Sequence, residues 1–80
     1  LTEERRRELS KRARSEGEGA RVGIRNARKD ANDYLKAAKD DGMSEDELKK
    51  GEQLVQELTN QFTDKVESVL AAKEADIMTI

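Results

Sequence analysis

A cluster of basic residues lies in the segment RVGIRNARKDAN, which spans residues 21–32. Arg21, Arg25 and Arg28 follow one another at steps of four and three, and Lys29 lies beside them. This spacing is the period of an α-helix, so the three arginines share a face. The planar guanidinium group of arginine makes paired hydrogen bonds to phosphate. The residue types and their spacing therefore indicate contact with a phosphate-bearing partner.

The same helical strip continues on both sides of this cluster. Its further members are Arg7, Arg14, Asn32, Lys36 and Lys39, interrupted chiefly by Glu3, Ser10 and Glu18. Asn32 adds a group able to bond a sugar or a base edge. A solvated helix face held by ion pairs four residues apart has a similar pattern, and spacing alone leaves that interpretation open. Glu18 lies near Arg21, but nothing acidic lies four residues before Arg25, which favours phosphate contact.

The composition narrows the class of protein. The chain has 80 residues, enough for one domain, and 34% of them are hydrophobic while 42% are charged, which fits long solvated helices. The sequence has no cysteine and no histidine, so it lacks thiol nucleophiles, disulfides, the usual zinc ligands and an imidazole base. The acidic run at 45–47 suits the start of a helix better than a metal site. We therefore expect no enzyme, no cofactor and no metal.

The two halves of the chain carry opposite charge. Residues 1–39 contain 12 basic and 7 acidic residues, a net charge of +5, and residues 40–80 contain 4 basic and 11 acidic residues, a net charge of -7. All eight arginines lie in the first half. Such asymmetry in a short chain indicates that one half meets a polyanion or that the two halves meet each other.

The boundary between the halves predicts a turn between two long helices. Gly42 is suited to end a helix in the left-handed conformation, and Ser44 with Glu47 forms a capping box that starts the next. Met43 is placed to pack on Leu48 as a hydrophobic staple. We predict a first helix at about residues 3–40, because Thr2 can cap its start and no proline interrupts it. A turn at 41–44 and a second helix at about 45–77 follow. Each helix would be about 50 Å long.

Each predicted helix has one apolar stripe. The first consists of Leu9, Ala13, Gly17, Ala20, Ile24, Ala27, Ala31, Tyr34, Leu35 and Ala38, and the second of Leu48, Gly51, Val55, Leu58, Phe62, Val66, Val69 and Ile77. The stripes can pack together as a long antiparallel hairpin, an all-α fold. Two helices leave much of each stripe open to water. We therefore expect a third helix or a second copy to complete the packing, and we interpret Tyr34 as a core or boundary residue.

No segment approaches the roughly 20 apolar residues that cross a bilayer, and no apolar leader precedes the first charges. We predict a cytoplasmic protein without membrane contact. The sequence begins at Leu1 rather than methionine, from which we expect a fragment of a larger protein.

Several segments together resemble the C-terminal part of the bacterial ribosome recycling factor family. They are LTEERRREL at 1–9, ARVGIRNARKDAN at 20–32, SEDEL at 44–48 and KEADIM at 73–78. The resemblance covers the whole chain. It implies a three-helix bundle with a β-rich domain inserted between its first and second helices. Residues 1–80 would then be helices two and three of that bundle, a partial domain without the first helix and the inserted domain.

The resemblance also implies a function. Family members split the post-termination ribosome together with elongation factor G, which their inserted domain engages, and their bundle lies against 23S-type rRNA of the large subunit. The resemblance implies rRNA contact at Arg6, Arg21, Arg25 and Arg28, and further at Arg7, Arg14, Lys29 and Asn32. The chain alone should not recycle ribosomes, and we expect the isolated hairpin to form a homodimer. The alternative is a purely structural hairpin or self-assembling module without nucleic-acid binding.

Overall fold

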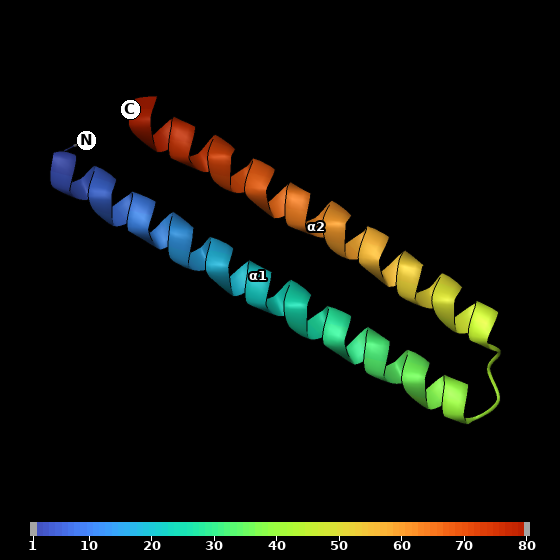
Figure 1. The fold of residues 1–80 in the computed structure, drawn as a ribbon. Coiled ribbons are helices and arrows are strands. Elements are labelled where there is room, and N and C mark those ends of the chain that lie inside the picture. Colours follow the sequence, from blue (N-terminus) through green and yellow to red (C-terminus); the bar gives the residue numbers. More distant parts are fainter. Residues whose placement is uncertain (1, 80) are drawn as a thin grey trace.

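The computed structural model describes residues 2–79, and these form two long helices joined by a tight turn. Helix α1 spans Glu3–Asp40 and helix α2 spans Glu45–Thr79, and no strand occurs within that range. The helices run antiparallel, so both ends of the chain lie together at the end opposite the turn (Figure 1). The predicted all-α hairpin is confirmed. Helix α2 extends two residues beyond its predicted end.

Local capping explains where both helices begin. The Thr2 hydroxyl accepts a hydrogen bond from the backbone N–H of Arg5 at 3.1 Å. The Ser44 hydroxyl accepts one from the backbone N–H of Glu47 at 3.1 Å. Each hydroxyl satisfies an N–H group that the first turn of a helix leaves without a backbone partner.

Gly42 ends α1. Its φ of 114° lies in the left-handed region, where a side chain would be strained. The N–H of Gly42 donates to the carbonyl of Lys39, and the N–H of Met43 donates to the carbonyl of Ala38 at 3.0 Å. This pair of bonds is a Schellman motif, which satisfies the last carbonyls of the helix. The turn residues therefore reverse the chain within a few residues.

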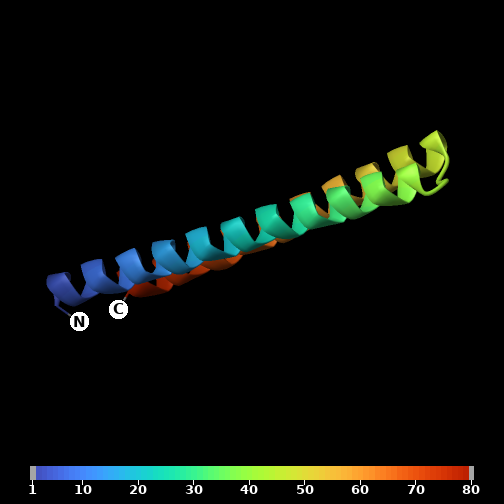
Figure 2. The ribbon, with the colours of Figure 1, turned by 90° about the horizontal axis from the view of Figure 1, so that it is seen from below.

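The hairpin is long and thin, with principal extents of 60 × 15 × 7 Å. The two helices lie side by side in Figure 1, and the view from below shows α1 in front of α2 (Figure 2). Ala13, at 6% exposure, is the one buried hydrophobic residue among those described. Two helices therefore bring their facing residues together without enclosing a core.

Two glycines allow the helices to approach closely. A methyl group at Gly17 would lie 3.1 Å from Cδ2 of Leu70, and one at Gly51 would lie 2.8 Å from Cδ2 of Leu35. Leucine side chains from the opposite helix therefore fill the space above both glycines. The helical cost of these two glycines is offset by close packing.

The contact line of α2 differs from the predicted stripe. Its partly buried residues are Leu48, Gly51, Val55, Thr59, Thr63, Val66, Leu70, Glu74 and Ile77. Leu58, Phe62 and Val69 were expected in this contact but are mainly exposed, Phe62 at 58%. Tyr34 was expected in the core or at its boundary and is 74% exposed. The apolar stripe is wider than the contact that one neighbouring helix makes, so its outer edge remains uncovered.

Candidate nucleic-acid interface

Helix α1 carries a pair of neighbouring residues, alanine followed by arginine, that recurs every seven residues. The pairs are Ala13 and Arg14, Ala20 and Arg21, and Ala27 and Arg28. Seven residues are nearly two turns of a helix, so equivalent members lie one above another. The contact with α2 runs through Gly17 and Leu35 and buries Ala13. Ala20 and Arg21 lie on opposite sides of it. A step of one residue thus separates two faces of the hairpin.

The first of these faces, called the basic face below, consists of Arg7, Arg14, Arg21, Arg25 and Asn32. Arg7, Arg14 and Arg25 are exposed, while Arg21 and Asn32 are partly buried. Arg25 lies one turn beyond Arg21. The structure therefore brings together most, though not all, of the residues that the sequence indicated for phosphate contact.

Arg21 is bound to α2 rather than pointing freely into solvent. Its Nε donates a hydrogen bond to Oε1 of Glu67 at 2.7 Å, and its NH1 lies 3.4 Å from Oε2 of Glu18. The side chain is 32% exposed. The hydrogen bond to Glu67 raises the pKa of Arg21, and the same bond lowers the pKa of Glu67. Both groups therefore remain charged at neutral pH.

Two other arginines of the basic face have acidic neighbours. Nε of Arg14 donates to Oε1 of Glu74 on α2 at 3.4 Å. NH2 of Arg25 lies 3.8 Å from Oε1 of Glu18, which it shares with Arg21. The sequence expectation that acidic partners of Arg21 and Arg25 are scarce was therefore wrong, since Arg21 pairs with Glu67 of α2 and Arg25 with Glu18. Neither of these two partners lies at a step of three or four along α1, so that spacing could not reveal them.

Arg28 and Lys29 lie at the edges of the basic face. A straight helix drifts by about 20° for every seven residues, so Arg28 does not lie directly in line with Arg14 and Arg21. Arg28 is exposed and also lines an apolar hollow together with Ala27 and Phe62. Lys29 lies on the other edge and pairs with Asp33 at 3.2 Å. Neither residue points in the same direction as Arg21.

Two predicted site residues hold a covered polar atom. Oδ1 of Asn32 and Nε of Arg6 are buried atoms without a hydrogen-bond partner within residues 2–79. Arg6 lines a shallow hollow near the open end of the hairpin with Arg7, Arg14 and Met78. Asn32 is thus partly shielded by the protein, and Arg6 lies beside the basic face rather than within it.

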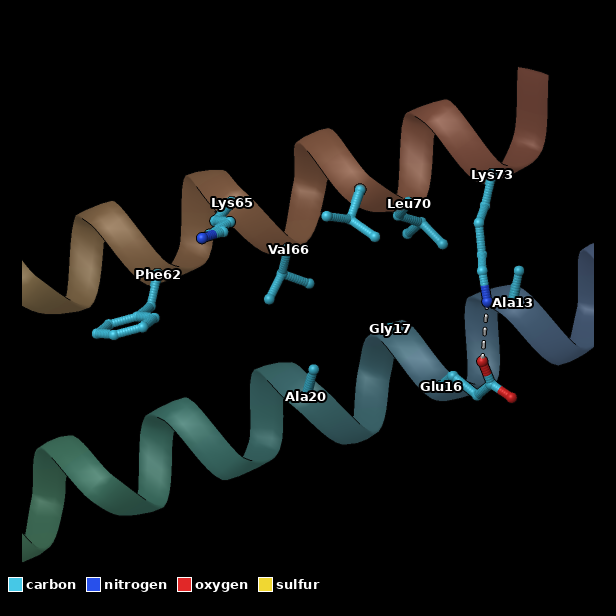
Figure 3. Close-up of a pocket in the computed structure, with 10 residues that line it drawn as sticks. Ala13, Glu16, Gly17, Ala20, Phe62, Lys65, Val66, Leu70 and Lys73 are labelled. Atoms are coloured by element: carbon cyan, nitrogen blue, oxygen red, sulfur yellow. Dashed lines mark ion pairs between the residues drawn. The ribbon is translucent and has the colours of Figure 1, made fainter. Parts of the chain in front are cut away.

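The opposite side of the hairpin is the apolar groove, defined here by Ala13, Ala20, Ile24 and Ala27 of α1 and Leu58, Phe62, Val66 and Val69 of α2. Figure 3 shows Val66 and Leu70 pointing from α2 toward the part of α1 that holds Ala20 and Gly17, with Phe62 further along α2. An ion pair between Lys73 and Glu16, with Nζ and Oε2 3.8 Å apart, spans the helices at one end of this view. The sequence predicted that part of each apolar stripe would stay open to water, but not which of its residues would line this groove.

The described residues were also compared with what a metal site or a membrane span requires. Within residues 2–79, no group of three or more acidic side chains is arranged to hold a metal ion. Neither helix in that range has a stretch long and apolar enough to cross a membrane.

Comparison with known proteins identifies the chain's relatives. The family model for ribosome recycling factor matches residues 1–78. The chain is 55% identical over 80 residues to the ribosome-recycling factor of Flavobacterium johnsoniae, covering 43% of that protein. It is 51% identical over 80 residues to the factor of Cytophaga hutchinsonii, covering 43%, and 52% identical over 81 residues to that of Neisseria gonorrhoeae, covering 44%. In each comparison the whole of this chain is matched, so it spans less than half the length of these relatives.

Proposed function

Since this chain belongs to the ribosome recycling factor family, we propose that its basic face binds the backbone of 23S-type ribosomal RNA in the large subunit. The chain acts as part of a translation factor and not as an enzyme. In the intact protein, the proposed activity is the splitting of post-termination ribosomes together with elongation factor G, in the cytoplasm. Because the chain spans less than half of its relatives, elongation factor G is proposed to engage other parts of the intact protein.

The observation that carries this proposal is the arrangement of guanidinium groups along one side of α1. Arg14, Arg21 and Arg25 lie on one face, and the ion pairs of Arg14 and Arg21 with α2 use Nε. The contacts with α2 therefore leave the terminal nitrogens for phosphate, although NH1 of Arg21 also lies 3.4 Å from Glu18, a longer contact that phosphate would replace. Arg6, Arg7, Arg28, Lys29 and Asn32 complete the proposed RNA site at the edges and ends of this face.

Filter binding to large-subunit rRNA at two salt concentrations tests the proposal. The double variant Arg25→Ala/Arg28→Ala should weaken binding and flatten the salt dependence. With fewer phosphate contacts, its binding releases fewer counterions from the RNA. The matched control is Lys49→Ala/Lys50→Ala, which removes the same charge from exposed positions of α2. Equal affinities for the two double variants would contradict binding at the basic face.

A second function, assembly through the apolar groove, is favoured by the exposure of large hydrophobic side chains. Leu58, Phe62 and Val69 are each between 43% and 58% exposed and lie along one side of α2. In the family's three-helix bundle, a further helix of the intact protein would cover this groove. For the isolated chain, we propose that a second copy covers it as an antiparallel four-helix dimer.

The position of Phe62 supports the antiparallel arrangement. Phe62 lies close to the middle of α2 and is 58% exposed. In an antiparallel pair of copies, the middle of one α2 can meet the middle of the other, so the two Phe62 side chains would cover each other. Sedimentation at micromolar concentration tests this, and a well-folded monomer would refute the dimer.

A further inference from the structure

The acidic residues next to the basic face differ in how they hold their arginines. Glu67 accepts from Nε of Arg21 at 2.7 Å, whereas Glu18 lies 3.4 Å from NH1 of Arg21 and 3.8 Å from NH2 of Arg25. The contact with Glu67 therefore has the distance of a strong charge-assisted hydrogen bond, and the contacts with Glu18 are longer. The two acids also approach different ends of the guanidinium group.

These differences have opposite consequences for a phosphate that approaches Arg21. Glu67 occupies the Nε–H and leaves the terminal nitrogens for a ligand. Glu18 approaches the terminal nitrogens of Arg21 and Arg25, and for Arg21 these are the atoms left for a bidentate phosphate contact once Nε is bound to Glu67. One carboxylate thus fixes the direction of the side chain, while the other occupies the position that the phosphate would take.

We propose that Glu67 is a positioning residue for RNA binding, holding Arg21 by Nε so that its terminal nitrogens meet phosphate, and that Glu18 competes with phosphate for those nitrogens. This inference rests on the proposed binding of RNA at the basic face. From net charge alone, the acidic helix α2 would be expected to repel RNA. The proposal instead gives α2 a supporting role in RNA binding.

A second contact of the same kind supports the role of α2. Arg14 also reaches α2 through Nε, which donates to Glu74 at 3.4 Å. Arg14 and Arg21 are seven residues apart on α1, and their partners Glu74 and Glu67 are seven residues apart on α2. The antiparallel packing therefore repeats the contact after about 10.5 Å of helix. Two carboxylates of α2 are therefore spaced to match two arginines of α1.

The raised pKa of Arg21 and the lowered pKa of Glu67 agree with this geometry. Each shift arises first from the side-chain hydrogen bond between the two groups. The pair therefore stays ionised across neutral pH, so the orientation of Arg21 persists under the conditions in which RNA would bind.

Two substitutions at Glu67 separate positioning from charge. Glu67→Gln and Glu67→Ala both remove one negative charge, but only the glutamine keeps an oxygen that can accept from Nε of Arg21. Filter binding to large-subunit rRNA should show Glu67→Gln at wild-type affinity or tighter, and Glu67→Ala weaker than Glu67→Gln by about threefold or more. The salt dependence of Glu67→Ala should approach that of Arg21→Ala.

The competing role of Glu18 is measured in the same assay. Glu18→Gln and Glu18→Ala should both tighten binding, because either change removes the charge that opposes phosphate. In an Arg21→Ala background, Glu67→Ala and Glu67→Gln should bind equally, since no side chain remains to be positioned. Circular dichroism of each variant checks that the helices are retained.

If the wild-type chain binds rRNA and Glu67→Ala and Glu67→Gln bind it equally well with Arg21 present, the positioning role of Glu67 is overturned and the proposed function is not. Unchanged binding by the Glu18 variants would overturn the competing role. A wild-type chain that fails to bind rRNA at low salt would instead overturn the proposed function, and the inference with it.

Discussion

The two faces of the hairpin are built from the same helices but have opposite chemistry. On the basic face, arginines of α1 lie beside carboxylates of α2, and each close contact is an ion pair. In the apolar groove, alanines of α1 leave room beside large side chains of α2, and Phe62 remains 58% exposed. Charged groups at the surface form hydrogen bonds with water and with each other. Covering exposed apolar surface with a partner lowers the free energy.

This difference indicates separate kinds of partner for the two faces. The alanine and arginine of each pair in α1, such as Ala20 and Arg21, are neighbours in sequence but belong to different faces. A substitution at one of them should therefore affect one activity and leave the other intact. The predictions below test that separation, in order of decreasing effect.

The largest expected effect is on assembly through the apolar groove. Phe62→Asp places a carboxylate where a partner must bury apolar surface, so dimer affinity should fall by about a hundredfold or more. Gln61→Asp introduces the same charge at a neighbouring exposed position and should leave assembly nearly unchanged. Sedimentation of both variants measures the difference. Retained dimerisation of Phe62→Asp would show that the groove is not the contact.

The next effect distinguishes two arginines that sequence spacing treats alike. Arg25 belongs to the basic face, whereas Arg28 is turned toward the apolar groove and lines it. Arg25→Ala should therefore weaken rRNA binding by about tenfold and reduce the salt slope by about one. Arg28→Ala should have a smaller effect in the same filter assay. A larger loss for Arg28→Ala would reverse the assignment of the two residues.

A smaller effect concerns the seam between the faces, where glycines bring the helices together. Nothing lies within 4 Å of a methyl group added at Gly19, so Gly19→Ala should raise the free energy of unfolding by about 1 kcal/mol. At Gly51 the same methyl group would lie 2.8 Å from Leu35, which must move, so Gly51→Ala should gain less or lose stability. Denaturant unfolding of both variants measures this. Equal stabilisation would show that Gly51 does not set the helix approach.

The smallest effect is the contribution of the Arg21 and Glu67 pair to acid stability. The pKa of Glu67 is lower in the folded chain than its ordinary value because Arg21 binds it. The pair therefore stabilises the fold above the usual glutamate range, and this contribution is lost as pH falls through the lowered pKa. Thermal unfolding should show a small deficit for Glu67→Gln at neutral pH that vanishes in acid. A deficit that grows in acid would have the wrong sign for this pair.

Much of the fold follows from local sequence signals. Thr2 and Ser44 act as helix caps, and Gly42 adopts the left-handed conformation, because these roles depend only on each residue and its nearest neighbours. The long helices follow equally from the apolar period and the absence of proline. The predicted hairpin needed no information about contacts between distant residues.

The features that the sequence did not reveal depend on the register between the helices. The pairing of Arg21 with Glu67 joins residues 46 positions apart, so no spacing within one helix indicates it. The contact through Thr59, Thr63 and Leu70 likewise depends on which edge of a broad apolar stripe α1 covers. In the structure, Gly17 and Gly51 mark where leucines of the other helix come close, but the sequence alone does not say which leucine meets which glycine.

The separation of the two faces is tested most directly by following backbone amide resonances of the labelled chain during titration with a large-subunit rRNA fragment. Amides around Arg14, Arg21 and Arg25 should shift in proportion to bound RNA, while those around Phe62 and Val69 remain in place. Shifts centred on Phe62 and Val69, with the arginine positions unchanged, would contradict the account.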